Sequence, residues 1–137
     1  MTSSAPVLDA SAVLAFLLDE PGADRVQAVA ARAEREATPC PMTTVNWGEV
    51  LYRVEQRAGA AAVPSFIETL DGMPIILIDA DRDLTVRAVA LKASRGLGYA
   101  DAYCAALALT LKAPVLTCDA DFDSLEHDGL LEVLRVR

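Results

Sequence analysis

Short apolar runs alternate with longer helical segments along the whole chain, and this alternation limits the fold most strongly. The clearest strand is Ile75-Ile76-Leu77-Ile78, because four aliphatic residues follow Gly72 and Pro74. Strands are predicted at 5–8, 40–42, 75–78, 114–117 and 130–136, and helices at 10–18, 23–37, 44–59, 61–70, 84–94 and 99–111. Strands that alternate with helices favour an α/β fold: a mainly parallel sheet of about five strands, with helices on both faces.

The length of the chain predicts one domain, covering residues 1–137. The longest strictly apolar run, 12–18, is 7 residues, whereas a membrane span needs roughly 20. We therefore expect no membrane helix. The first nine residues, MTSSAPVLD, lack the basic region that opens a secretory signal, so a cytoplasmic protein is expected.

Histidine and cysteine usage excludes several kinds of chemistry. The chain has one histidine, His127, in the polar segment SLEHDG, where we expect a solvent-facing loop. Two-histidine acid–base catalysis is therefore excluded, and a Ser-His-Asp triad is disfavoured. The three cysteines form no C-x-x-C pair and have no histidine at zinc-ligand spacing, so we expect buried apolar side chains.

Acidic side chains stand at the ends of two predicted strands. Asp9 directly follows the first strand, and Asp119 follows the strand that ends at Thr117. Ligands of open α/β sheets bind at the carboxyl ends of the strands, so the two carboxylates are expected at one edge.

Asp101 and Glu49 are expected at the same edge. Asp101 lies in the first turn of the otherwise apolar helix 99–111, which runs antiparallel to the strand that follows it. The alternative for Asp101 is a favourable interaction with the helix N-terminus. Glu49 lies about two turns into its helix and shares a face with Asn46 and Arg53; alone, it would be an ordinary solvated glutamate.

A cluster of these carboxylates must bind protons or a cation. Two unit charges about 4 Å apart repel by roughly 4 kcal/mol at an effective dielectric constant of 20. Oxygen ligands without histidine or thiolate select hard cations, such as Mg²⁺ or Mn²⁺. Metal-assisted hydrolysis of a phosphodiester is the chemistry that follows. The net charge of −8 opposes nucleic-acid binding unless basic residues gather locally.

The chain resembles the PIN-domain ribonucleases, and among them the short VapC-type toxins of prokaryotic toxin–antitoxin pairs. The resemblance covers nearly the whole chain and rests on three segments: VLDASAVLAFLLDEPG, TTVNWGEVLYRV and LGYADAYCAALALTLKAPVLTCDADF. It implies an Mg²⁺-dependent endoribonuclease, with Mn²⁺ as a substitute, that leaves a 3′-hydroxyl and a 5′-phosphate. Its implied catalytic and metal-binding residues are Asp9, Glu49, Asp101 and Asp119.

The resemblance also implies partners. An antitoxin would lay a short segment over the active-site groove and insert a cationic side chain. A homodimer is expected, and a heterotetramer or larger assembly with the antitoxin is possible. The substrate would be single-stranded or loop RNA. Candidates for contacts with the RNA backbone are Arg53, Arg57, Lys92, Arg95 and Lys112, each of which could instead be a solvated helix charge.

Three further residues are secondary candidates. Ser11 could orient Asp9 or a metal-bound water, or it could cap the following helix. Asp121 could assist the site, or it could be a loop or capping acid. Thr117, at the end of its strand, could hydrogen-bond to a site carboxylate.

Three alternative functions remain open. One is a catalytically silent PIN fold that only binds a partner protein. The presence of all four acids counts against it, because a silent copy could lose them at little cost. Another is a phosphatase that forms an aspartyl phosphate within Asp79-Ala80-Asp81, but Asp9 and Asp101 would then have no role. Calcium loops at 79–90 and 119–130 are disfavoured, because they lack the glycine and glutamate that such loops need.

Overall fold

The computed structural model describes residues 5–137. Its strands are β1 (Val7–Leu8), β2 (Cys40–Thr43), β3 (Ile75–Ile78), β4 (Val115–Thr117) and β5 (Val133–Arg135). Its α-helices are α1 (Ala10–Leu17), α2 (Ala23–Arg35), α3 (Thr44–Ala58), α4 (Val63–Asp71), α5 (Arg82–Arg95), α6 (Tyr99–Leu111) and α7 (Asp123–His127). Two short 3₁₀ turns, η1 (Ala60–Ala62) and η2 (Ala120–Phe122), precede α4 and α7.

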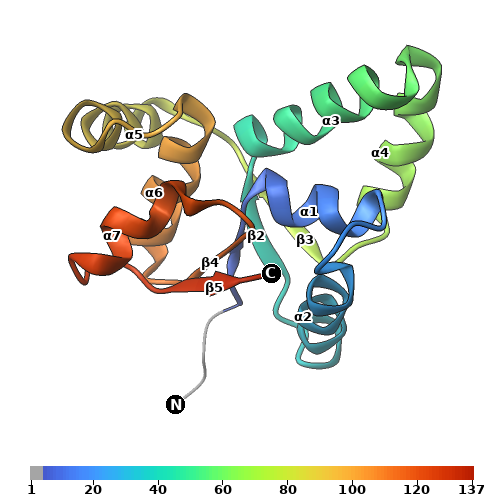
Figure 1. Cartoon of the computed structure of the whole chain (residues 1–137), viewed down its shortest axis with the longest axis horizontal. Coiled ribbons are helices and arrows are strands. Elements are labelled where there is room, and N and C mark those ends of the chain that lie inside the picture. Colours follow the sequence, from blue (N-terminus) through green and yellow to red (C-terminus); the bar gives the residue numbers. More distant parts are fainter. Residues whose placement is uncertain (1–4) are drawn as a thin grey trace.

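All strand pairs in the described part of the chain are parallel, which confirms the predicted α/β fold. The hydrogen-bonded order is β1-β4-β5 in one sheet and β2-β3 in the other. β2 packs beside β1, so the five strands form one layer through the centre of the molecule (Figure 1). β1 is only two residues long, and its ladder of hydrogen bonds runs to β4.

Helices cover both faces of this layer. Successive strand residues point to opposite faces, and the core divides accordingly. Val7 and Val115 pack with α5, α6 and α7, whereas Leu8 and Leu116 pack with α1, α2, α3 and α4. Figure 1 shows these two groups of helices on either side of the strands. Both faces of the paired strands β1 and β4 are thus buried, as expected of a covered parallel sheet.

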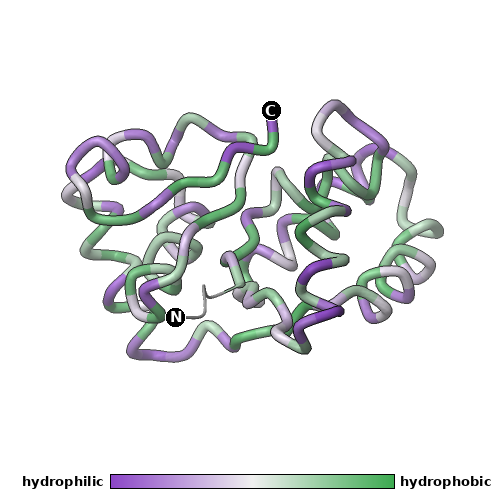
Figure 2. The backbone as a smooth tube through the Cα atoms, turned by 90° about the horizontal axis from the view of Figure 1, so that it is seen from below, coloured by the Kyte–Doolittle hydropathy of each residue, from purple (hydrophilic) through white to green (hydrophobic). Residues whose placement is uncertain are grey.

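The sequence prediction missed some local structure. The short helix α7 was not predicted, and the last strand covers only 133–135 rather than 130–136. Gly129, with φ of +72°, ends the turn after α7, and Leu130 is 46% exposed, so the chain is not yet in the sheet there. In Figure 2, hydrophilic and hydrophobic stretches alternate along the peripheral helices, which matches their amphipathic role.

No helix within residues 5–137 has the length and apolar character to cross a membrane. The segment considered for a secretory signal begins with residues 1–4, which lie outside the described residues.

The turn between α1 and α2 packs tightly against the end of the chain. Gly22 has φ of +98°, and a Cβ atom there would lie 2.3 Å from Val136 Cγ1 and 2.8 Å from the Val136 carbonyl oxygen. Glycine is thus required both for the backbone conformation and for the close approach.

Replacing Gly22 by alanine should lower the free energy of unfolding by about 1–3 kcal/mol, because the substitution adds strain and a clash. The matched control is Gly48→Ala within α3, where a Cβ atom meets nothing within 4 Å. That change should stabilise the protein by about 0.5–1 kcal/mol. Urea unfolding in EDTA measures both, and equal effects of the two substitutions would contradict this account of the turn.

Candidate metal centre

Three carboxylates meet at one edge of the sheet. Asp9 directly follows β1, Asp119 follows β4, and Asp101 lies in the first turn of α6. One oxygen from each residue lies within 4.8 Å of the other two. Among residues 5–137 this is the one group of three or more acidic, histidine or cysteine side chains close enough to hold a metal ion. The structure therefore brings together three of the four acids selected from the sequence.

Two hydroxyl groups orient Asp9. The Ser11 hydroxyl donates to Asp9 Oδ2 at 2.7 Å, and the Thr117 hydroxyl donates to the same oxygen at 2.8 Å. Each hydroxyl in turn accepts a backbone N–H: Ser11 from Cys118 at 2.9 Å, and Thr117 from Asp119 at 2.8 Å. Since each hydroxyl has a single proton, both protons are directed at Oδ2.

The second oxygen of Asp9 is left over. Asp9 is 1% exposed, and its Oδ1 is the one buried side-chain polar atom of the described residues that has no hydrogen-bond partner. A buried carboxylate oxygen without a partner is costly. The Asp9 carboxylate lies beside those of Asp101 and Asp119, so a cation is the ligand that this arrangement fits. The donor set contains only oxygen, which suits Mg²⁺ or Mn²⁺.

The carboxylates perturb one another. Burial raises the pKa of Asp101 to about 9, with further contributions from a hydrogen bond to Asp121 and from the charges of Asp9 and Asp119. Burial and the charge of Asp9 also raise the pKa of Asp119 and of Glu49. Without a cation the cluster therefore retains a proton near neutral pH.

Glu49 lies beside the cluster but outside the group of three oxygens. It projects from α3 and forms an ion pair with Arg53, with 3.9 Å between Arg53 Nη2 and Glu49 Oε2. The start of α3 is fixed by Thr43, whose side chain accepts the N–H of Asn46 at 3.0 Å. The buried Asn46 side chain then donates to the carbonyl of Ala100 at 3.0 Å, which ties α3 to the start of α6.

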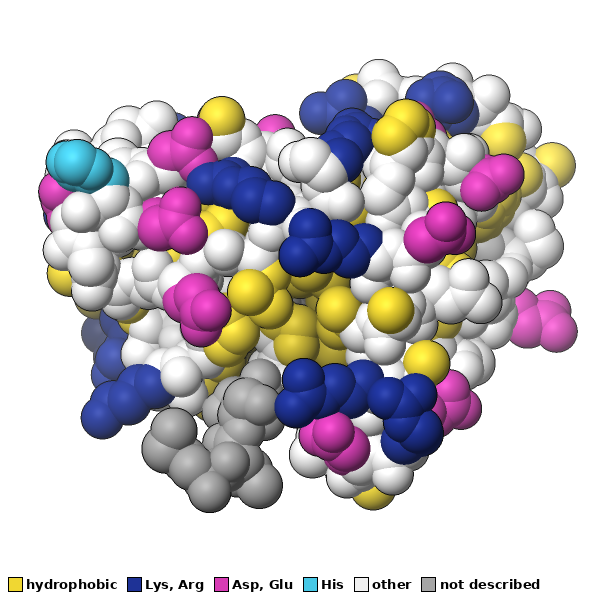
Figure 3. Space-filling model, turned by 60° about the horizontal axis from the view of Figure 1, so that its bottom comes forward, with side chains coloured by type: hydrophobic (Ala, Val, Ile, Leu, Met, Phe, Trp, Pro, Cys, Tyr) yellow, Lys and Arg dark blue, Asp and Glu magenta, His cyan; other side chains and the backbone are white. Residues whose placement is uncertain are grey.

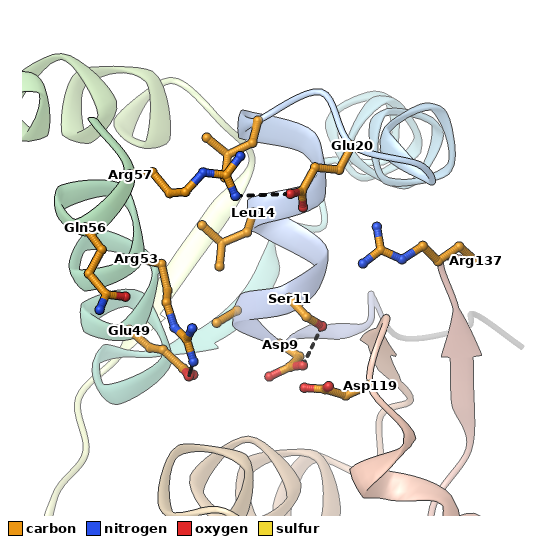
Figure 4. Close-up of a pocket in the computed structure, with 12 residues that line it drawn as sticks. Asp9, Ser11, Leu14, Glu20, Glu49, Arg53, Gln56, Arg57, Asp119 and Arg137 are labelled. Carbon is orange, nitrogen blue, oxygen red and sulfur yellow. Dashed lines mark hydrogen bonds and ion pairs between the residues drawn. The ribbon is translucent and has the colours of Figure 1, made fainter. Parts of the chain in front are cut away.

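A cavity of about 310 Å³ opens beside the carboxylates (Figure 4). Asp9, Glu49 and Asp119 line one end, and Arg53 and Arg57 line the wall that α3 forms. Two charged residues of the cavity were not selected from the sequence, Glu20 and Arg137. Both depend on how distant segments pack, since the turn after α1 and the end of the chain meet here.

The other basic residues considered for RNA contacts lie elsewhere. Lys92 Nζ donates to the Leu97 carbonyl at 2.8 Å, Arg95 pairs with Asp128, and Lys112 caps the end of α6. None of these three lines the cavity.

The structure also shows where the secondary candidates and the alternative sites lie. Ser11 contacts Asp9, whereas the N-cap residue of α1 is Asp9 itself. Asp121 lies in η2 next to Asp101. Asp81 caps α5 by accepting the N–H of Leu84 at 2.9 Å, so this acid has a structural role away from the cluster. His127 is exposed, as expected, but it lies at the end of α7 rather than in a loop.

A second cavity, of about 250 Å³, has a different character. Its lining is mainly apolar and includes Pro6, Val29, Ala33, Pro114 and Leu134. In Figure 3, hydrophobic side chains line a hollow on the lower face of the molecule, and lysine and arginine side chains border it. Glu36 and Glu132 line the second cavity, but the cluster of three carboxylates lies beside the first, which is therefore the candidate metal centre.

One protein family matches most of the chain. The family model described as the PIN domain matches residues 7–128. No curated protein matches the chain.

Solved structures match over nearly the full length. One, from Salmonella typhimurium, is described as DNA-bound VapBC; it is 12% identical, with a TM-score of 0.69 and 100% of both chains covered. A toxin–antitoxin complex from Klebsiella pneumoniae is 18% identical, with a TM-score of 0.66 and coverage of 96% of this chain and 98% of that chain. VapBC-5 from Mycobacterium tuberculosis is 26% identical, with a TM-score of 0.58 and the same coverage.

The raised pKa of Asp101 predicts how stability depends on pH. Between about pH 4 and 9 the folded protein holds a proton on Asp101 that the unfolded chain has lost, so the metal-free protein should become less stable as pH rises. The expected slope is up to about 1 kcal/mol per pH unit. Urea unfolding in EDTA between about pH 5.5 and 8 measures it. Asp101→Asn should reduce the slope of the unfolding free energy against pH. An unchanged slope in this variant would mean that other groups cause the dependence.

A divalent cation should stabilise the folded protein through Asp9. A ligand that binds only the folded state adds roughly 2.7 kcal/mol at a hundredfold excess over Kd, which corresponds to a rise of several degrees in Tm. Thermal unfolding against Mn²⁺ concentration measures the response. Asp9→Asn should reduce the rise in Tm with Mn²⁺. Asp81→Asn should keep this response, because Asp81 caps α5 away from the cluster and asparagine also caps helices well. A response lost in Asp81→Asn but kept in Asp9→Asn would instead place the cation-binding site in the segment before α5.

Proposed function

Because the chain belongs to the PIN domain family, we propose that it is a metal-dependent endoribonuclease and the toxin of a toxin–antitoxin pair. One observation carries the proposal: the buried carboxylate of Asp9, whose Oδ1 has no hydrogen-bond partner, lies beside the carboxylates of Asp101 and Asp119. Two hydroxyls use up the other oxygen of Asp9, so Oδ1 is the atom free to act as a ligand.

The proposed ligands are Asp9, Asp101 and Asp119, with Glu49 at the margin of the site. These residues would hold Mg²⁺ or Mn²⁺, which would supply a lowered pKa for bound water and neutralisation of the charge on a phosphate. Asp101 gives up its proton when the cation binds, because a coordinating carboxylate must be ionised. Glu49, which is paired with Arg53, contributes its negative charge from the margin of the site.

The surroundings of the cluster fit a phosphodiester substrate. The cavity opens directly from Asp9 and Asp119, and arginines line its wall. No histidine contributes, since His127 is exposed on α7 and does not line the cavity. Proton removal therefore falls to the carboxylates and the cation. Single-stranded or loop RNA is the proposed substrate, because its unstacked bases can be splayed out and contacted by the protein.

The proposed partner is an antitoxin protein. The structures described as VapBC complexes from Salmonella typhimurium and Mycobacterium tuberculosis share the fold over nearly the full chain. An antitoxin that covers the cavity would block the carboxylates and exclude RNA. We place the protein in the cytoplasm, where such a pair would meet its RNA target.

Cleavage should require a divalent cation and the clustered acids. Purified protein, free of antitoxin, is incubated with labelled structured RNAs and Mg²⁺ or Mn²⁺. EDTA should abolish cleavage, and Asp9→Asn or Asp101→Asn should lower its rate by at least about a hundredfold, because an amide keeps the size but loses the charge that binds the cation. The control His127→Ala should cleave at the rate of the unmodified protein.

Three results would count against the proposal. Cleavage that persists in EDTA would rule out the metal-dependent mechanism. A folded Asp101→Asn protein with full activity would return Asp101 to a structural role at the start of α6. Absence of cleavage under all metal conditions would favour the silent, partner-binding PIN fold.

A further inference from the structure

Two arginines that line the cavity beside the carboxylates have no part in the proposed chemistry. Arg57 and Arg137 both line the cavity. In Figure 4, Arg57 lies beside Glu20, far from Asp9 and Asp119, and Arg137 reaches in from the end of the chain. Arg57 is two turns beyond Glu49 on α3, about 12 Å along the helix axis. A phosphate held at the carboxylates cannot contact Arg57 as well.

Arg57 is held by an ion pair across the cavity. Arg57 Nη1 lies 3.6 Å from Glu20 Oε2, which joins α3 to the turn that follows α1. The Arg57 side chain is 62% exposed and that of Glu20 is 31% exposed. Ion pairs this exposed contribute little to stability. A stronger anionic partner can therefore replace Glu20 at small cost.

Arg137 is anchored without using up its donors. Its Nη1 donates to the Pro21 carbonyl at 3.0 Å, on the same turn that carries Glu20. A guanidinium has five N–H donors in a planar fork, so others remain available to a ligand in the cavity. The contact between Gly22 and Val136 fixes the end of the chain against this turn.

We propose that Arg57 and Arg137 form a subsite for backbone phosphates of the RNA strand, away from the scissile bond, with one phosphate for each arginine, and that Glu20 holds Arg57 until a phosphate replaces it. This subsite rests on the proposed function. Arginine suits the role, because its fork binds phosphate through paired, charge-assisted hydrogen bonds. The subsite also accounts for RNA binding by a chain with net charge −8, since the attraction is local.

The experiment measures binding separately from cleavage. A fluorescent single-stranded RNA of mixed sequence is titrated with the full chain carrying Asp101→Asn, in Mg²⁺, over a series of salt concentrations. Arg57→Gln and Arg137→Gln are then added singly. Each should weaken binding by about three- to tenfold and reduce the slope of log K against log salt by about 0.7, the value for one phosphate contact on a single strand.

Two further variants separate the subsite from general charge effects. The control Arg35→Gln makes the same charge change at the end of α2, outside the cavity. It should leave affinity and salt slope nearly unchanged. Glu20→Gln should strengthen binding by about threefold, because it frees Arg57 for the phosphate. That gain should disappear when Arg57→Gln is combined with it.

The outcomes distinguish the subsite from the proposed function. RNA binding that does not respond to either arginine substitution, or responds equally to Arg35→Gln, would overturn the subsite while the nuclease proposal stands. Weaker binding by Glu20→Gln would also overturn it. A parent protein that binds no RNA would overturn both proposals. The expected pattern is lower RNA affinity on substitution of Arg57 or Arg137, higher affinity on substitution of Glu20, and unchanged affinity on substitution of Arg35.

Discussion

The repulsion among carboxylates at one sheet edge governs the rest of this site. Asp9, Asp101 and Asp119 place oxygens within 4.8 Å of one another, and burial raises the pKa of Asp101 to about 9. A parallel sheet makes the convergence unavoidable, since β1 and β4 end side by side and α6 begins at that edge. The fold therefore maintains an arrangement that is unfavourable until a proton or a cation neutralises it.

The hydrogen bonds around Asp9 engage only one of its two carboxylate oxygens. Ser11 and Thr117 accept backbone N–H groups and direct their own protons to one carboxylate oxygen. The other oxygen is buried and has no hydrogen-bond donor. A carboxylate retained only for structure would be expected to have both oxygens satisfied. The missing donor is thus the feature that links the local packing to metal binding.

The sequence predicted the positions that depend on chain order and periodicity. Asp9 and Asp119 follow short apolar runs, and Asp101 interrupts an apolar helix, so their common edge follows from the topology alone. Asn46, which ties α3 to the carbonyl of Ala100, was noticed only as a neighbour of Glu49, because its partner is 54 residues away in the chain. Arg137 and Glu20 were missed for the same reason: tertiary packing alone brings them to the cavity. The roles assigned to the four acids remain predictions.

The central claim is that Asp9 Oδ1, Asp101 and Asp119 bind one divalent cation. The most direct measurement is an anomalous difference map from crystals of the protein grown with Mn²⁺. The account predicts a strong peak about 2.1 Å from Asp9 Oδ1, in contact with a carboxylate oxygen of Asp101 or Asp119. A peak confined to the segment of Asp79 and Asp81, or no peak and a hydrogen-bond donor seated on Asp9 Oδ1, would contradict it.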